Sequence, residues 1–169
     1  ANMGVILPKM GFFKRLIKIT KDNGVVLIFD EVITGFRVAL GGAQEIFDIK
    51  PDMTILGKIL GGGLPIGAFG GRREIMNMLS PDGPVYQAGT LSGNPVAVEA
   101  GINTIKALMK NSIYDKLNAL GAGLELGLNQ IINRSKHRII AKRLGSLFTL
   151  FFTDKKEIID YNGASSCDL

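Results

Sequence analysis

The sequence predicts an α/β fold: a mostly parallel sheet with flanking helices, followed by the start of a smaller α+β domain. Two short apolar runs, residues 25–29 and 53–56, are each followed within two residues by a charged residue. Continuous apolar runs between helical segments are typical of strands buried on both faces of a parallel sheet. Two long helical patterns, residues 95–109 and 113–133, come after them and complete the α/β prediction.

The first half of the chain is expected to alternate helices and strands. Apolar side chains recur at helical spacing from Gly11 to Asn23, and Asn23-Gly24 provides a helix stop. Val25 to Phe29 then gives the first buried strand, with Asp30 at its end. The further elements expected are a helical turn at 43–47, strands at 53–56 and 66–69, a helix at 72–79 and a turn-rich loop at 80–84.

The second half of the chain is expected to begin with helices and to lead into another domain. Pro95 suits the first turn of the helix at 95–109. Gly121, Gly123 and Gly127 lower helix propensity in the next helix, which predicts close backbone packing there. A strand at 147–152 opens the smaller domain, so we divide the chain into a partial large domain, residues 1–101, and a helical connection with a partial small domain, residues 102–169.

The composition narrows the possible classes of function. Of the 169 residues, 46% are hydrophobic and 21% charged, as in a globular protein, and no apolar run reaches the ~18 residues of a membrane helix. We therefore expect a cytoplasmic protein without a membrane partner. Cys167 and His137 are the only residues of their types, which excludes an internal disulfide, a cysteine or histidine metal cluster and a histidine triad.

The net charge of +5 raises the question of nucleic-acid binding. The basic residues are spread along the chain and gather only at Lys136, His137, Arg138, Lys142 and Arg143. Single-strand binders interleave such residues with aromatic side chains, and this cluster has none. We expect the cluster to be a solvated helix end, and we expect no nucleic-acid partner.

Three residues at strand ends or in glycine-containing loops are candidates for chemistry: Asp30, Lys58 and Thr90. Alone, each has an ordinary explanation as a helix cap, a solvated lysine or a common dipeptide. Lys58, however, lies between an apolar strand and Gly61-Gly62-Gly63. Burial among such neighbours would lower the lysine pKa, and an unprotonated amine attacks aldehydes. Asp30 and Lys58 together match the ligand crevice at the carboxyl ends of parallel strands.

Three segments carry a resemblance to a known family. They are residues 29–37 (FDEVITGFR), 56–65 (LGKILGGGLP) and 86–95 (YQAGTLSGNP). In this order and at these separations they resemble the class III branch of fold-type I pyridoxal-phosphate enzymes. The run RVALGGAQE at 37–45 and the sequence around Gly89-Thr90 are similar to those of the glutamate-1-semialdehyde aminomutase family.

The resemblance implies roles around the cofactor ring. Lys58 would hold pyridoxal 5'-phosphate in a Schiff base and then shuttle protons. Asp30 would accept a hydrogen bond from the pyridine nitrogen and keep it protonated. Val32 would pack on one face of the ring.

The resemblance also implies a homodimer with shared sites. Gly89 and Thr90 would contact the cofactor phosphate of the neighbouring subunit, and Tyr86 and Gln87 would line its substrate pocket. Asn2 resembles the residue near the ring hydroxyl. For Arg37 two roles stay open, a structural ion pair and contact with a substrate carboxylate.

The implied activity is conversion of glutamate-1-semialdehyde to 5-aminolevulinate for tetrapyrrole synthesis, with pyridoxamine 5'-phosphate as the starting form of the cofactor. Alternatives are another class III transaminase, a racemase of the same fold, or a non-catalytic fragment of the fold. The chain lacks an initiator Met and the upstream phosphate loop of the family, so we expect an internal fragment. We expect this fragment to bind the cofactor weakly and to have little or no activity.

Overall fold

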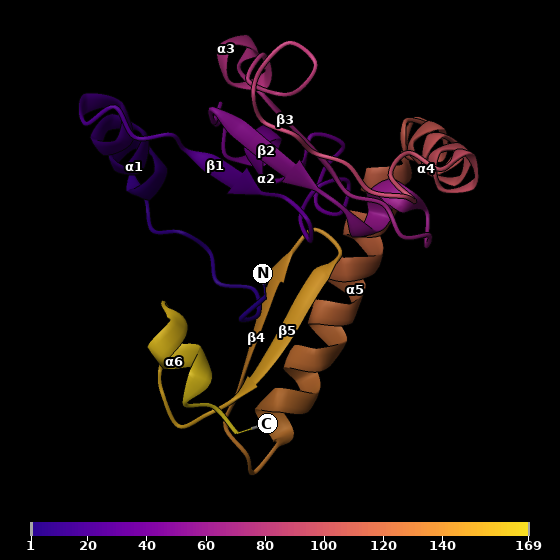
Figure 1. Cartoon of the computed structure of the whole chain (residues 1–169). Helices are drawn as coiled ribbons and strands as arrows, with labels where there is room; N and C mark the ends of the chain where they lie inside the picture. The colour runs from indigo at the N-terminus through magenta and orange to yellow at the C-terminus, as the bar shows by residue number, and fades with distance from the viewer. Residues whose placement is uncertain (1, 169) are drawn as a thin grey trace. The chain divides into compact units, whose positions relative to one another are not determined.

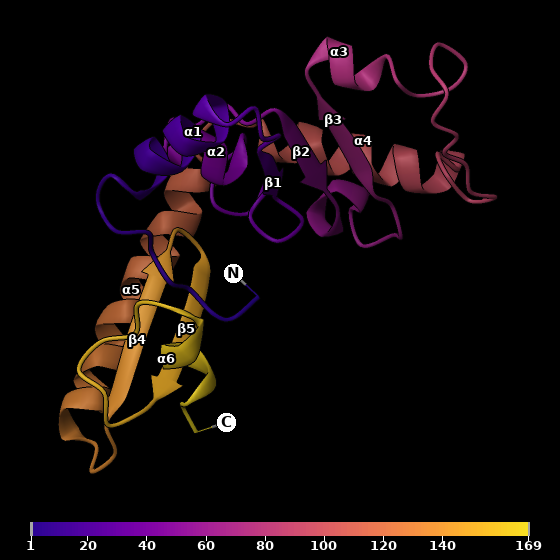
Figure 2. The same cartoon turned by 60° about the vertical axis from the view of Figure 1, so that its left-hand side comes forward.

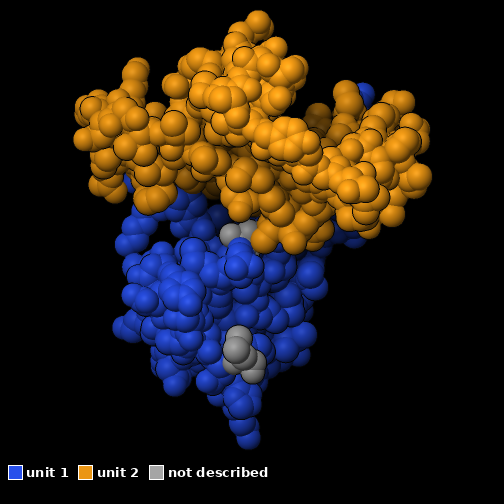
Figure 3. All heavy atoms as spheres, viewed as in Figure 1, with its two compact units in different colours: residues 1–10, 111–169 blue, residues 11–110 orange. Residues whose placement is uncertain are grey.

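The computed structural model describes residues 2–168 and divides the chain into two compact units (Figure 3). Unit 1 comprises residues 1–10 and 111–169, and unit 2 comprises residues 11–110. The α/β class is confirmed, since helices and strands alternate in unit 2 and a helix precedes a strand pair in unit 1. The large-domain and small-domain limits, 1–101 and 102–169, concern a longer protein and stay a prediction.

The sheet of unit 2 has three strands, β1 (Ile28–Asp30), β2 (Met53–Leu56) and β3 (Ala68–Gly71), in the order β1-β2-β3 (Figures 1 and 2). β1 runs parallel to β2, whereas β3 runs antiparallel to it. The described sheet is therefore mixed. Because it ends at β1 and β3, two of its three strands are edge strands.

The first strand is shorter and more exposed than the sequence predicts. It begins at Ile28, not Val25, and Ile28 is 49% exposed. Val25 and Val26 precede it and are also exposed. Burial on both faces, as predicted, requires neighbouring elements on each side. The predicted burial on both faces is wrong for this chain, because no element covers Ile28, Val25 and Val26 fully among the described residues.

The third strand begins at Ala68, two residues later than predicted, and ends on Gly70-Gly71. Glycine is disfavoured in strands, so the sequence pattern gave no sign that the strand continues there. Its backbone is held by pairing with β2, from Leu56↔Ala68 to Met53↔Gly71.

Short helices surround the sheet of unit 2. They are α1 (Phe12–Asp22), α2 (Gly42–Ile46), the 3-10 helix η1 (Lys58–Gly61), α3 (Arg73–Met76) and α4 (Pro95–Leu108). The predicted α1 and its stop at Asn23 are confirmed, and α3 is shorter than the predicted 72–79. The Phe13 ring packs against Phe29 of β1 and Phe47 at the end of α2, with centroids 5.5 and 5.1 Å away.

Unit 1 contains α5 (Ile113–Arg134), the antiparallel pair β4 (Ile139–Leu144) and β5 (Leu147–Phe152), and α6 (Tyr161–Ser165). In Figures 1 and 2, α5 lies along the β4-β5 hairpin. The strand at 147–152 is confirmed, whereas β4 and α6 were not predicted. No helix among residues 2–168 is both long enough and apolar enough to cross a membrane.

The basic cluster of residues 136–143 does not form a helix end. α5 stops at Arg134, and Lys142 and Arg143 lie in β4. The Arg143 guanidinium donates to the Glu125 carboxylate at 2.7 Å and to the Gly145 carbonyl at 2.9 Å. The predicted helix end is wrong for Lys142 and Arg143, because both lie in a strand and Arg143 pairs with α5 and the hairpin turn.

The α5 glycines differ in their surroundings. A Cβ atom on Gly121 would lie 2.7 Å from the Gly145 carbonyl oxygen, so the predicted close packing is confirmed at Gly121. A Cβ on Gly123 or Gly127 would meet nothing within 4 Å, and there the prediction was wrong. α5 therefore approaches the hairpin turn closely at Gly121.

Candidate functional site

The parallel pairing of β1 and β2 brings Asp30 and Lys58 to the same edge of the sheet. Asp30 pairs with Ile55, and the backbone N–H of Glu31 donates to the Ile55 carbonyl at 2.9 Å. After Ile55 the chain passes through Leu56 and Gly57 and reaches Lys58, the first residue of η1. Asp30 and Lys58 thus follow neighbouring strands at their carboxyl ends, where ligands bind in open α/β sheets.

The Asp30 carboxylate is held by a local turn. Its Oδ1 atom accepts a hydrogen bond from the backbone N–H of Val32 at 3.0 Å. The side chain is exposed, so the carboxylate can still be reached by a ligand. A short polar side chain bound to the backbone two residues on has little freedom to turn away.

Lys58 has an unusual backbone conformation and an accessible amine. Its φ angle is +49°, in the left-handed region that residues with a Cβ atom enter at a cost of roughly 1–2 kcal/mol. Such strained residues cluster at functional sites. Among the described residues its ammonium has no ion-pair partner. The predicted burial is wrong: Lys58 is exposed, because the glycines around it contribute no side chains to cover it.

Val32 lies against the residue that precedes Lys58. A Cβ atom on Gly57 would lie 3.4 Å from Val32 Cγ1, so the valine methyl reaches the Gly57 backbone. The structure thereby brings Asp30, Val32 and the start of η1 together at one edge of the sheet.

The loop that contains Gly89 and Thr90 borders a cavity of unit 2. Gln87, Gly89 and residues 91–93 line a cavity of about 630 Å³ together with residues 65–69. Neither Asp30 nor Lys58 lines this cavity. Thr90 is exposed, and Tyr86 is 81% exposed. Within one chain, this loop therefore lines a cavity that Asp30 and Lys58 do not line.

The roles of Asn2 and Arg37 remain predictions. Asn2 is exposed and belongs to unit 1, whereas Asp30 and Lys58 belong to unit 2. Arg37 follows the turn after β1, and its side chain is exposed. Both of its possible roles stay open.

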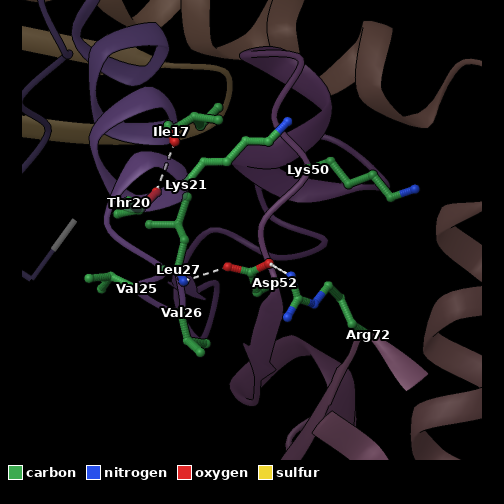
Figure 4. Close-up of a pocket in the computed structure, with 10 residues that line it drawn as sticks. Ile17, Thr20, Lys21, Val25, Val26, Leu27, Lys50, Asp52 and Arg72 are labelled. Carbon is green, nitrogen blue, oxygen red and sulfur yellow. Dashed lines mark hydrogen bonds and ion pairs between the residues drawn. The ribbon is translucent and has the colours of Figure 1, made fainter. Parts of the chain in front are cut away.

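A second cavity, of about 400 Å³, lies at the opposite ends of the strands (Figure 4). Asp52 links two of the segments that line this cavity. Its carboxylate accepts a hydrogen bond from the Leu27 N–H at 2.7 Å and forms an ion pair with Arg72 at 2.9 Å. Lys21 and Lys50 also line the cavity. These contacts join the three strands where β1 and β2 begin and β3 ends, so the cavity is remote from the candidate site. Residues 2–168 contain no group of three acidic, His or Cys side chains that could hold a metal ion.

Sequence reasoning gave Glu31 no role, yet it is the one fully buried charged side chain among the described residues, with 1% of its surface exposed. Its carboxylate accepts hydrogen bonds from the backbone N–H groups of Ala43 and Gln44 at 2.9 and 2.8 Å, and from the Thr34 hydroxyl. The signal in the sequence was an acidic residue directly after an apolar strand, but the same signal also suits an exposed turn.

Comparison with known proteins decides the family. The sequence profile described as "Aminotransferase class-III" matches residues 1–162. The chain belongs to the class-III aminotransferase family. This membership covers both units and includes all three motif segments.

Relatives within the class-III aminotransferase family refine the comparison. The chain is 53% identical over 167 residues to glutamate-1-semialdehyde 2,1-aminomutase of Methanococcoides burtonii, covering 99% of this chain and 39% of that protein. It thus spans about two fifths of the length of the relative. An ω-transaminase from Sphaerobacter thermophilus has a similar structure, with a TM-score of 0.88, 35% identity, and coverage of 96% of this chain and 37% of that one. A transaminase with PLP bound matches with a TM-score of 0.78, 28% identity, and coverage of 84% and 34%.

Proposed function

We propose that the chain is the cofactor-holding segment of a pyridoxal-phosphate-dependent aminomutase, and that the whole protein converts glutamate-1-semialdehyde to 5-aminolevulinate. The observation that carries this proposal is the shared sheet edge of Asp30 and Lys58, set by the β1-β2 register. The identity of 53% to an aminomutase supports the substrate. The PLP-bound transaminase of similar fold supports the cofactor.

The residues at this edge suit pyridoxal phosphate chemically. The cofactor needs an amine, an anionic acceptor for its ring nitrogen and an apolar surface for its ring. Lys58 supplies an exposed amine that has no ion-pair partner within residues 2–168, and Asp30 supplies an exposed carboxylate. Val32 supplies methyl groups beside Gly57, directly before Lys58.

Each of these residues then has a defined task. Lys58 would hold the cofactor covalently through Nζ, with loss of water from the cofactor's aldehyde, and as a free amine would take and return protons at the substrate carbon. The Asp30 carboxylate accepts a hydrogen bond from the ring nitrogen and keeps that atom protonated. Val32 limits the position of the ring from one side. When bound, the cofactor acts as an electron sink for the carbanion at the substrate carbon.

The proposed site is completed by a second subunit. We assign Gly89 and Thr90 to the cofactor phosphate of a partner subunit, as the family resemblance implies. Tyr86 and Gln87 are proposed for the partner's substrate pocket, and Asn2 for contact with the ring hydroxyl. The homodimer implied by the resemblance and the cytoplasmic location expected from the composition stay predictions.

Covalent trapping tests the cofactor site. The 169-residue chain is incubated with pyridoxal 5'-phosphate and borohydride, and the labelled lysines are mapped by mass spectrometry. We expect weak labelling with preference for Lys58 over Lys116, an exposed lysine of α5. Labelling of Lys58 no greater than that of Lys116 would contradict the proposal. Lys58→Ala should remove the preferred adduct, whereas Lys116→Ala should leave it unchanged.

Product analysis tests the reaction. A protein of the relatives' full length that contains this segment should form 5-aminolevulinate from glutamate-1-semialdehyde without any keto acid. The isolated 169-residue chain should form little or none. The similarity to an ω-transaminase supports one alternative, a class-III transaminase with an external amino acceptor. A strict requirement for a keto acid would favour that alternative.

A further inference from the structure

We infer that Glu31 is a positioning residue for the proposed cofactor site, because it fixes the turn that carries Asp30 and Val32 and ties it to the strand that leads to Lys58. This inference rests on the proposed function and adds a residue to it. Glu31 itself is too deeply buried to contact a ligand at the sheet edge.

The Glu31 carboxylate joins the turn after β1 to the first residues of α2. Its Oε2 atom accepts from the Ala43 N–H at 2.9 Å and from the Thr34 hydroxyl. Its Oε1 atom accepts from Gln44 twice, from the backbone N–H at 2.8 Å and from Nε2 at 3.2 Å. An ionised carboxylate is an acceptor only, and here each of its oxygens meets two donors.

The Glu31 backbone shapes the same turn. Its carbonyl accepts from the Gly35 N–H at 2.7 Å, and its own N–H continues the ladder to Ile55. Asp30 and Val32 flank Glu31 and are bound to each other by the Asp30 Oδ1 hydrogen bond. A shift of the Glu31 side chain therefore moves both residues that we propose for the cofactor ring.

The connection extends to the strand before Lys58. Gln44, which donates to Glu31, accepts at Oε1 from the Thr54 hydroxyl of β2 at 3.1 Å. The Glu31–Gln44–Thr54 chain thus bridges β1 and β2 by side chains, in addition to their backbone pairing. This bridge ties the turn that carries Asp30 and Val32 to β2, the strand that leads to Lys58.

Two glycines, Gly42 and Gly35, lie so close to Glu31 that neither position has room for a side chain. A Cβ atom on Gly42 would lie 2.5 Å from Glu31 Oε2, and Gly42 has a φ angle of +71°. A Cβ on Gly35 would lie 2.8 Å from the Glu31 carbonyl oxygen. Gly42 is thus packed against the Glu31 carboxylate and Gly35 against the Glu31 backbone, so both ends of the residue are held closely by the turn.

Glu31→Gln is the substitution that tests this role. It keeps the shape but turns one acceptor oxygen into an NH2 group, which must then face the Ala43 N–H and Thr34 hydroxyl or the two Gln44 donors. Glu45→Gln is the matched control, because Glu45 also accepts from a backbone N–H of this loop, Gly41 at 2.6 Å, but is exposed and does not reach β1. Thr34→Val is a milder variant that removes one donor.

The experiment traps pyridoxal 5'-phosphate with borohydride on each 169-residue variant, at a temperature where far-ultraviolet circular dichroism shows it folded. Glu31→Gln should lower labelling of Lys58 about tenfold, the effect of disturbing hydrogen bonds to a charged group, and Thr34→Val should lower it less. Labelling of Lys116 and of the Glu45→Gln variant should not change. The circular dichroism of the bound cofactor, per mole of Lys58 adduct, should also fall, because the ring is then held less rigidly.

The outcomes separate this inference from the proposed function. If the unaltered chain shows no preference for Lys58, the proposed cofactor site fails and this role fails with it. If it prefers Lys58 and Glu31→Gln labels equally well when folded, only the positioning role is overturned. A loss of labelling that follows the folded fraction alone, with unchanged cofactor dichroism per adduct, would show a purely structural role and also overturn it. If Glu31→Gln does not fold, Thr34→Val decides by the same two measurements.

Discussion

Gly101 of α4 and Leu60 of η1 approach each other so closely that a Cβ atom on Gly101 would lie 2.3 Å from the Leu60 carbonyl oxygen. Gly62, two residues after Leu60, also lies beside α4: a Cβ atom on Gly62 would be 2.4 Å from the Thr104 hydroxyl oxygen. α4 is thus the surface against which η1, the segment that begins with Lys58, is packed.

Gly101→Ala should displace η1 and reduce labelling of Lys58 by pyridoxal 5'-phosphate. The added methyl group meets a backbone carbonyl, which cannot rotate away as a side chain can, and overpacking of this kind costs about 1–3 kcal/mol. Hydrogen exchange should rise in residues 57–64. Asn103→Ala, on an exposed position of the same helix, is the control and should change neither quantity. Unchanged exchange in Gly101→Ala would show that η1 is not held by α4.

Lys58→Gly should be more stable than Lys58→Ala, by about 1 kcal/mol. The φ angle of +49° suits glycine, whereas alanine keeps the Cβ atom that makes this conformation costly. The free energy of local opening, from hydrogen exchange of residues 53–61, measures the difference. At Lys116, inside α5, the order should be reversed, because glycine costs about 1 kcal/mol relative to alanine within a helix. Equal stability of the two Lys58 variants would mean that the backbone there is unstrained.

The fold could be predicted from the sequence where local signals agree with the final contacts. The limits of β5 and the stop of α1 at Asn23 follow from apolar spacing and turn residues within the segments themselves. The end of β3 on Gly70-Gly71 could not be predicted in this way, because only pairing with β2 makes a strand of two glycines. β4 was missed because Lys142 and Arg143 interrupt its apolar pattern, and their partners come from elsewhere in unit 1.

The candidate site shows the same division. Asp30 and Lys58 follow apolar runs, so their placement at one sheet edge could be predicted from the parallel register. The exposure of Lys58 could not, because a glycine-rich context is compatible both with a buried amine and with an open one. An acidic residue directly after a strand can equally lie exposed in a turn. Glu31 is buried because of the position of α2, which begins 11 residues later in the chain.

Asp52→Asn should weaken the sheet at the end away from the candidate site. The carboxylate holds the Leu27 N–H and the Arg72 guanidinium at once, and an amide oxygen can replace only one of these acceptors. We expect a loss of about 1 kcal/mol, since Arg72 is half exposed and the ion pair is partly screened. Hydrogen exchange of residues 26–30 reports the loss. Glu74→Gln removes the other, more exposed, ion pair of Arg72 and should cost less than about 0.5 kcal/mol.

Gly121→Ala and Gly123→Ala should have opposite effects on the stability of unit 1, although only one residue separates the two positions in α5. At Gly121 the new methyl group would lie 2.7 Å from the Gly145 carbonyl oxygen and 3.3 Å from the Arg143 side chain, which forces the helix and hairpin apart at a cost of about 1–3 kcal/mol. At Gly123 nothing lies within 4 Å, so alanine should stabilise the helix by about 0.5–1 kcal/mol. Hydrogen exchange of α5 peptides measures both changes in the same experiment. If Gly121→Ala slowed exchange as Gly123→Ala should, α5 would not be packed against the turn at Gly145.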